Sequence, residues 1–200
     1  DARAVHLRES ILIYVSRAVQ SVEQLQGFFE RELFKSVVGG EGERDWAWWN
    51  EGLASFYARI YRLRSGELTF QDYVKEINVL IAQYYRSSVK KITNATLAQT
   101  YSKDPSVRAL ATQRGELLAL QWFLATKKRT DFTLDDALRA MRESMLSKGT
   151  DLNFENLQRV LRPYLGDHVQ QELRDKIVRG TVQAPDKGAM GPCVELVNKK

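Results

Sequence analysis

The sequence predicts an all-α protein, in which a multi-helix bundle is followed by an irregular C-terminal tail. Apolar residues recur every three or four positions along nearly the whole chain, which is the spacing of one face of a helix. Residue types that favour helix N-caps stand in front of many of these runs. Glycines and prolines separate the runs and are frequent beyond residue 180.

Residues 1–38 form the first predicted unit, an N-terminal amphipathic helical segment. Apolar residues at helical spacing line one face of it, namely Ile11, Val15, Ala18, Val22, Leu25, Phe29 and Leu33. Ser21 and Gln24 have the spacing of a capping box, so the segment contains either one helix or two. A cluster of glycines within residues 39–42 then interrupts the pattern.

Residues 39–180 form the second predicted unit, a helical domain. Its first helix begins at Asp45, a suitable N-cap, and ends at Ser65-Gly66. Thr69 and Asp72 cap the next helix, whose apolar face consists of Phe70, Tyr73, Ile77, Leu80 and Tyr84. Further helices are expected at residues 94–101, from 105 onward, and at 115–126, 133–147, 153–165 and 167–178. The segment 115–126 is the most hydrophobic, so it should be the central buried helix.

Residues 181–200 form the irregular tail, in which residues 194–197 are the only expected strand. No internal repeat of fixed period is present, which argues against a helical solenoid. The expected architecture is therefore two helical units and a tail.

Composition places the chain among ordinary globular proteins, with 44% hydrophobic and 28% charged residues. No apolar run approaches about 18 residues, so we expect no membrane span and no membrane partner. The N-terminus has no signal-peptide pattern, and the first residue, Asp1, indicates a processed product or a piece of a longer chain. The compartment stays open.

The distribution of charge argues against a nucleic-acid partner. The net charge is +5, but the clusters of basic residues are short and lie at residues 90–91, 127–129 and 199–200. Domains that bind nucleic acid usually gather such charge on one stripe, with exposed aromatic side chains between the basic ones.

Residues 45–57 contain the strongest functional candidate, Glu51. Three of the four tryptophans precede it, and small residues and two aromatic residues follow. On a helix Glu51 would lie one turn from Trp48 and Ser55, on faces that carry buried bulk. A buried carboxylate must be paired, hydrogen-bonded or bound to a cation. Alternatively, Glu51 reaches solvent near a helix N-terminus, where the helix dipole favours a negative charge.

No complete catalytic set accompanies Glu51. The two histidines, His6 and His168, lie far apart in sequence, whereas a zinc site on one helix needs two imidazoles one turn apart. Cys193 stands in the tail without a neighbouring histidine. The glycine cluster at residues 39–42 lacks the lysine and the serine or threonine of a phosphate-binding loop. We therefore expect no catalytic residue in this chain.

Residues 49–57, Trp-Asn-Glu-Gly-Leu-Ala-Ser-Phe-Tyr, resemble the segment of gluzincin zinc metallopeptidases that carries the third zinc ligand. The closer resemblance is to the glycyl aminopeptidase family, and it covers most of the chain after residue 45. Its further matching segments are residues 62–73, 114–120, 133–138, 178–181 and 188–193. The order and spacing of these segments carry the resemblance.

This resemblance implies a fold, a metal and a site. The helical domain would be similar to the C-terminal helical domain of gluzincin peptidases. Glu51 would stand at the position of the carboxylate that binds zinc. A groove near Glu51, lined by Trp46, Trp48, Trp49 and Tyr57, would contact a peptide substrate.

The chain departs from this family in the residues that perform the chemistry. The His-Glu-x-x-His segment, which supplies two zinc ligands and a general base, is absent from the sequence. Thr112-Gln113 stand where the family tends to have a tyrosine. Catalytic zinc normally takes three protein ligands, so Glu51 alone would not hold it. We expect no cofactor in this chain, although the family that it resembles uses zinc.

Three functions stay open, and whether the chain is an enzyme depends on which of them holds. The favoured function is that of a degenerate, metal-free helical domain that binds a peptide or has a structural role. The second is that of a truncated piece of an active zinc metallopeptidase, which removes N-terminal residues from peptides. The third is that of a helical adaptor, which binds a protein partner through an exposed apolar stripe.

Overall fold

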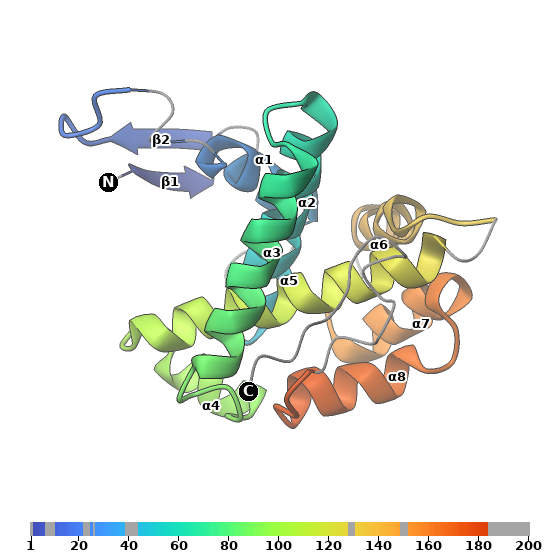
Figure 1. The fold of residues 1–200 in the computed structure, drawn as a ribbon. Helices are drawn as coiled ribbons and strands as arrows, with labels where there is room; N and C mark the ends of the chain where they lie inside the picture. Colours follow the sequence, from blue (N-terminus) through green and yellow to red (C-terminus); the bar gives the residue numbers. More distant parts are fainter. Residues whose placement is uncertain are drawn as a thin grey trace.

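Helix α5 (Pro105–Lys127) lies at the centre of the fold, where neighbouring helices pack against it (Figure 1). These neighbours are α2 (Ala47–Ser65), α3 (Phe70–Arg86), α4 (Asn94–Thr100), α6 (Leu134–Lys148) and α7 (Phe154–Leu165). The computed structural model describes residues 2–6, 11–21, 25, 27–38, 44–127, 131–148 and 152–183. Its described elements are helices apart from one pair of strands, which confirms the predicted all-α class.

The predicted central helix is correct in position but too short. Residues 105 and 115 belong to one continuous helix, which Pro105 begins because its fixed φ suits the first helical turn. All residues from Gln113 to Leu120 are buried, so this part of α5 is surrounded by protein on every side. Such all-round burial explains why the segment is apolar on most of its faces.

Helix α2 follows a short 3₁₀ turn, η2 (Arg44–Trp46). Asp45 lies inside this turn, and Trp46 takes the N-cap position without a capping side-chain hydrogen bond, so the predicted cap at Asp45 is wrong. The predicted end is confirmed, because Gly66 adopts the left-handed conformation with φ of 82°.

Helices α2 and α5 cross at a contact between two glycines. A Cβ atom placed on Gly115 would lie 1.7 Å from the carbonyl oxygen of Trp48, and one placed on Gly52 would lie 2.4 Å from the Cα of Gly115. Neither position can hold a side chain without moving a backbone. The absence of side chains at both glycines therefore allows the two helices to approach this closely.

Hydrogen bonds confirm three of the predicted helix starts. Thr69, Thr133 and Asn153 each accept a bond from the backbone N–H three residues later, at 3.1, 3.2 and 2.9 Å. On α3 the predicted apolar face is buried from Tyr73 onward, but Phe70 in the first turn is half exposed. The predicted helix at 167–178 consists of α8 (Val169–Glu172) and a π-helical continuation, η3 (Leu173–Val178).

The predicted N-terminal helical segment is partly wrong. Strands β1 (Ala2–His6) and β2 (Ile11–Val15) form an antiparallel pair, in which Val5 lies opposite Leu12 (Figure 1). Among the described residues of this segment, the α-helix is confined to α1 (Phe28–Val38). The run Ile-Leu-Ile-Tyr-Val consists of β-branched, aromatic and other apolar residues that favour strands. Its members at 11 and 15 also fit a helical period, which is why the pattern was ambiguous.

The chain beyond η3 returns to the centre of the fold. The backbone N–H of Gln183 donates to the Tyr84 hydroxyl at 3.0 Å, and its side-chain amide donates to the Arg114 carbonyl at 3.0 Å. The expected strand at residues 194–197 lies outside the described residues.

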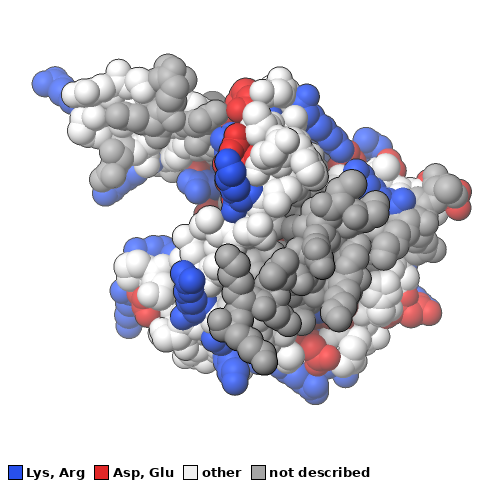
Figure 2. Space-filling model, in the orientation of Figure 1, with Lys and Arg blue, Asp and Glu red and all other residues white. Residues whose placement is uncertain are grey.

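The described helices give no candidate for a membrane span, because none is both long and apolar enough to cross a bilayer. Among the described residues on the face seen in Figure 2, lysine and arginine side chains lie in separate groups with acidic and uncharged ones between them.

Gly115→Ala is expected to destabilise the protein by about 3 kcal/mol, because the added methyl group forces α2 and α5 apart. On an open helix the same change would stabilise by about 1 kcal/mol. Ala109→Gly, at an exposed position of α5, serves as the control and should cost only about 1 kcal/mol. Chemical denaturation measures all of these changes, and a stabilised Gly115→Ala variant would contradict the close crossing.

Candidate functional site

Glu51 lies in the second turn of α2 and forms an ion pair with Lys35 of α1. The Lys35 Nζ atom is 2.8 Å from the Glu51 carboxylate, whose side chain is 25% exposed. The same ammonium group lies 3.0 Å from Glu32, which is almost completely buried. Glu32 and Lys35 are three residues apart and therefore project from one face of α1. Glu51 is thus paired, which was one of the three possibilities expected of a buried carboxylate, and it also keeps part of its surface in solvent.

The described residues contain no group of three histidine, cysteine or acidic side chains that could hold a metal ion. His168 stands at the start of α8, near Glu172 and far along the chain from Glu51. The side chains of His6 and Cys193 lie outside the described part of the structure. In the described part, the cation beside Glu51 is thus the ammonium group of Lys35.

The tryptophans predicted to contact substrate belong to the core. Trp48 and Trp49 are fully buried and Trp46 is 4% exposed, so none of them lines an open groove in this structure. Their rings pack on one another, on Phe154 and on Trp122. The physical reason is that large aromatic rings contribute most when fully removed from water, and the crossing of α2 over α5 provides that environment. The prediction that Trp46, Trp48 and Trp49 line an open groove is therefore wrong.

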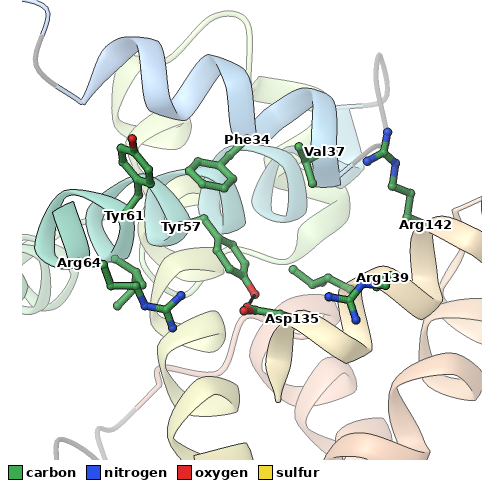
Figure 3. Close-up of a pocket in the computed structure, with 10 residues that line it drawn as sticks. Phe34, Val37, Tyr57, Tyr61, Arg64, Asp135, Arg139 and Arg142 are labelled. Carbon is green, nitrogen blue, oxygen red and sulfur yellow. Dashed lines mark hydrogen bonds between the residues drawn. The ribbon is translucent and has the colours of Figure 1, made fainter. Parts of the chain in front are cut away.

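Tyr57, the remaining predicted substrate contact, borders a cavity. The cavity lies between α1, α2 and α6 and has a volume of about 340 Å³ (Figure 3). We call it the α1/α2/α6 pocket. It is lined by Phe34, Val37, Tyr57, Ile60, Tyr61, Arg64, Asp135, Leu138, Arg139 and Arg142.

The floor of this pocket holds a hydrogen-bonded pair. The Tyr57 hydroxyl donates to the Asp135 carboxylate at 2.8 Å, across two helices that are distant in sequence (Figure 3). Burial, together with the negative charge of Asp135, raises the pKa of the Tyr57 phenol far above its ordinary value. Tyr57 therefore stays protonated and acts as a fixed hydrogen-bond donor.

A second group of charges, which is partly buried, lies on the other side of α2. Arg59 bonds Glu116 of α5 at 2.8 Å and also contacts Glu76 of α3. Burial raises the pKa of the Glu116 carboxyl, while the Arg59 charge opposes this shift. Because each charge has a partner on another helix, we interpret this group as a structural connection between three helices.

Sequence reasoning missed most of the residues in the pocket. Phe34 lies in a segment whose predicted apolar face consists of other residues, and no sequence pattern singles out Arg64 in the last turn of its helix. Asp135 and Arg139 come about eighty residues after Tyr57, and no local signal indicates that α6 packs beside α2.

Comparisons with protein families and with curated proteins found no match: no protein-family model matches this chain, and no curated protein matches it either.

Tyr57→Phe is expected to lower the free energy of unfolding by about 1 kcal/mol near neutral pH, because Asp135 loses its donor. A tyrosine whose pKa is raised in the folded state contributes stability that is present below its unfolded pKa, about 10, and lost as pH rises above it. The difference between wild type and Tyr57→Phe should therefore shrink above about pH 10.

Tyr61→Phe is the matched control, since Tyr61 lines the same pocket but is half exposed. Denaturant titrations at several pH values should show little effect of this change. Equal losses in the two variants would contradict the role of the bond between Tyr57 and Asp135.

Proposed function

We propose that this protein is a metal-free helical module that binds a peptide or protein segment and does not cleave it. The observation that carries the proposal is the position of Lys35, whose ammonium group lies 2.8 Å from the carboxylate that the gluzincin resemblance assigns to zinc. A carboxylate that already has a cationic partner in its own fold has less to gain from a metal ion.

The surroundings of Lys35 support this proposal. Lys35 lies between Glu32 and Glu51, and Arg31 adds a longer contact to Glu32 at 3.4 Å. Both carboxylates therefore have cationic partners from α1. A zinc ion at Glu51 would repel the ammonium group, and the described residues contain no group of three histidine, cysteine or acidic side chains that could hold it.

The alternative of a truncated active peptidase is less favoured. A missing histidine-bearing helix would need space next to Glu51, but α1 packs along α2 and places Lys35 there. Supplying the absent ligands from a longer chain would thus require α1 to move away.

The helical adaptor is the second candidate, and one observation favours it. Phe29, Leu33 and Val37 recur every four residues on α1 and are 39%, 57% and 40% exposed. An apolar stripe left open in this way is a common feature of surfaces that bind other proteins. The adaptor and the favoured function both lack catalysis. They differ in the size of the partner.

The purified chain is expected to contain no stoichiometric zinc and to leave substrates with amino-terminal glycine or alanine intact. Glu51→Ala should leave any residual activity unchanged, because there is no metal to lose. Metal analysis and hydrolysis assays measure both. Stoichiometric zinc, or hydrolysis that falls when Glu51 is replaced, would refute the metal-free function.

Lys35→Met tests the ion pair directly. It should lower the free energy of unfolding by about 2 kcal/mol, because Glu32 and Glu51 then face each other without the ammonium group. Added zinc should raise the melting temperature of this variant and not that of the wild type, since a divalent cation can replace the lost charge.

Lys75→Met is the matched control, because Lys75 pairs with Asp72 at the same helical spacing but on the surface. Its effect should stay within about 0.5 kcal/mol. If zinc raises the melting temperature of the wild type as much as that of the Lys35→Met variant, Lys35 does not take the place of a metal ion.

A further inference from the structure

We propose that the α1/α2/α6 pocket binds an acidic peptide segment, with one apolar side chain in the cavity and a neighbouring carboxylate against Arg64 and Arg139. This inference rests on the proposed function and adds the site and the chemical class of the ligand.

The apolar part of the pocket has the size and character of a side-chain binding site. Its volume of about 340 Å³ falls at the lower end of the range for small-molecule sites. Phe34, Tyr57 and Tyr61 provide aromatic surface, with ring centroids 5.5 Å and 6.4 Å from Phe34 to the two tyrosines. Such a wall favours an aromatic or branched aliphatic side chain.

The charged part of the pocket favours an anion. Three arginines, Arg64, Arg139 and Arg142, line it together with a single acidic residue, Asp135. The Tyr57 hydroxyl already binds that carboxylate. A ligand in the apolar cavity would therefore meet more positive than negative charge, and guanidinium groups bind carboxylates through paired N–H donors.

The arginines are available for such a ligand. Arg64 and Arg142 form no ion pair within the described residues, and Arg139 pairs only with Asp136 on the surface, at 2.9 Å. A guanidinium has five N–H donors, so Arg139 keeps donors for a second acceptor. In Figure 3, Arg64 extends from α2 and Arg139 from α6 toward the same part of the cavity, near Asp135.

The exposed stripe on α1 shows where a longer peptide would continue. Val37 belongs to both the pocket and the stripe, and Leu33 and Phe29 follow at intervals of one turn. A peptide with its acidic and apolar anchors in the pocket would thus find further apolar surface along α1. This continuity favours a peptide over a free small anion.

The test uses the whole chain and three fluorescent peptides, with binding followed by fluorescence anisotropy. The first is Gly-Ser-Glu-Phe-Glu-Ser-Gly with an amidated C-terminus, and the second replaces both glutamates by glutamine. The third, Gly-Ser-Gln-Phe, ends in a free carboxylate. We expect the first to bind at least tenfold more tightly than the second, and the affinity to fall with added salt.

The third peptide identifies the source of the carboxylate. Binding comparable to that of the first peptide supports recognition of a chain terminus, whereas binding as weak as that of the second supports recognition of an acidic side chain. Arg64→Gln and Arg139→Gln should each weaken binding of the first peptide about tenfold. Val37→Asp should abolish it, because it puts a negative charge at the apolar rim.

Arg86→Gln, at an exposed position near the end of α3, is the matched control and should bind like the wild type. Melting temperatures of all variants establish that they fold. Equal affinity for the acidic and neutral peptides, or unchanged affinity in folded Arg64→Gln and Arg139→Gln, would overturn the inference.

These outcomes differ from failure of the proposed function. Cleavage of the peptides by a zinc-containing chain would refute the metal-free function, even if Arg64 and Arg139 were still needed for binding. If the chain contains no zinc, cleaves no peptide and does not bind the acidic peptide, only the inference about the pocket is refuted.

Discussion

The close crossing of α2 and α5 at Gly52 and Gly115 is the constraint on which the rest of the fold depends. Two backbones that touch leave no space for side chains between them, so the bulky residues of α2 must project to either side of the contact. Trp48 and Trp49 fill the space beside the crossing, and both are fully buried. This contact fixes the position of α2 relative to α5 at one point. The remaining faces of α2 then pack against other helices.

The neighbours of α2 divide its polar residues into two groups with different roles. Toward α3 and α5, Arg59 pairs with Glu116 and Glu76, so these charges are satisfied among helices that are already buried. Toward α1 and α6, Glu51 pairs with Lys35 and Tyr57 bonds Asp135, whereas Arg64 lines the cavity without an ion pair among the described residues. Among the described residues, Arg64 and Arg142 line a cavity on this second side without forming an ion pair, which is why the ligand site is proposed there.

Local sequence patterns predicted where helices begin and end far better than they predicted which side chains the packed helices place next to one another. The caps at Thr69, Thr133 and Asn153 and the stop at Gly66 follow from side-chain hydrogen bonds and backbone freedom that act within four residues. The N-terminal strands were missed because Ile11 and Val15 fit a helical period as well as a strand, and tertiary context decided between the two. The pocket could not be predicted at all, since it depends on α6 packing beside α1 and α2.

The resemblance around Glu51 has a structural explanation that does not require zinc. Within the matching segments, Trp49 and Gly52 build the crossing on one helix, and Gly115 with its buried flanking residues builds it on the other. These residues are needed to pack α2 against α5 whether or not a metal lies nearby. The pattern therefore follows from helix packing alone, provided that a cation neutralises the Glu51 carboxylate. Lys35 supplies a positive charge to Glu51 from α1, so the packing around this carboxylate suits an ion pair.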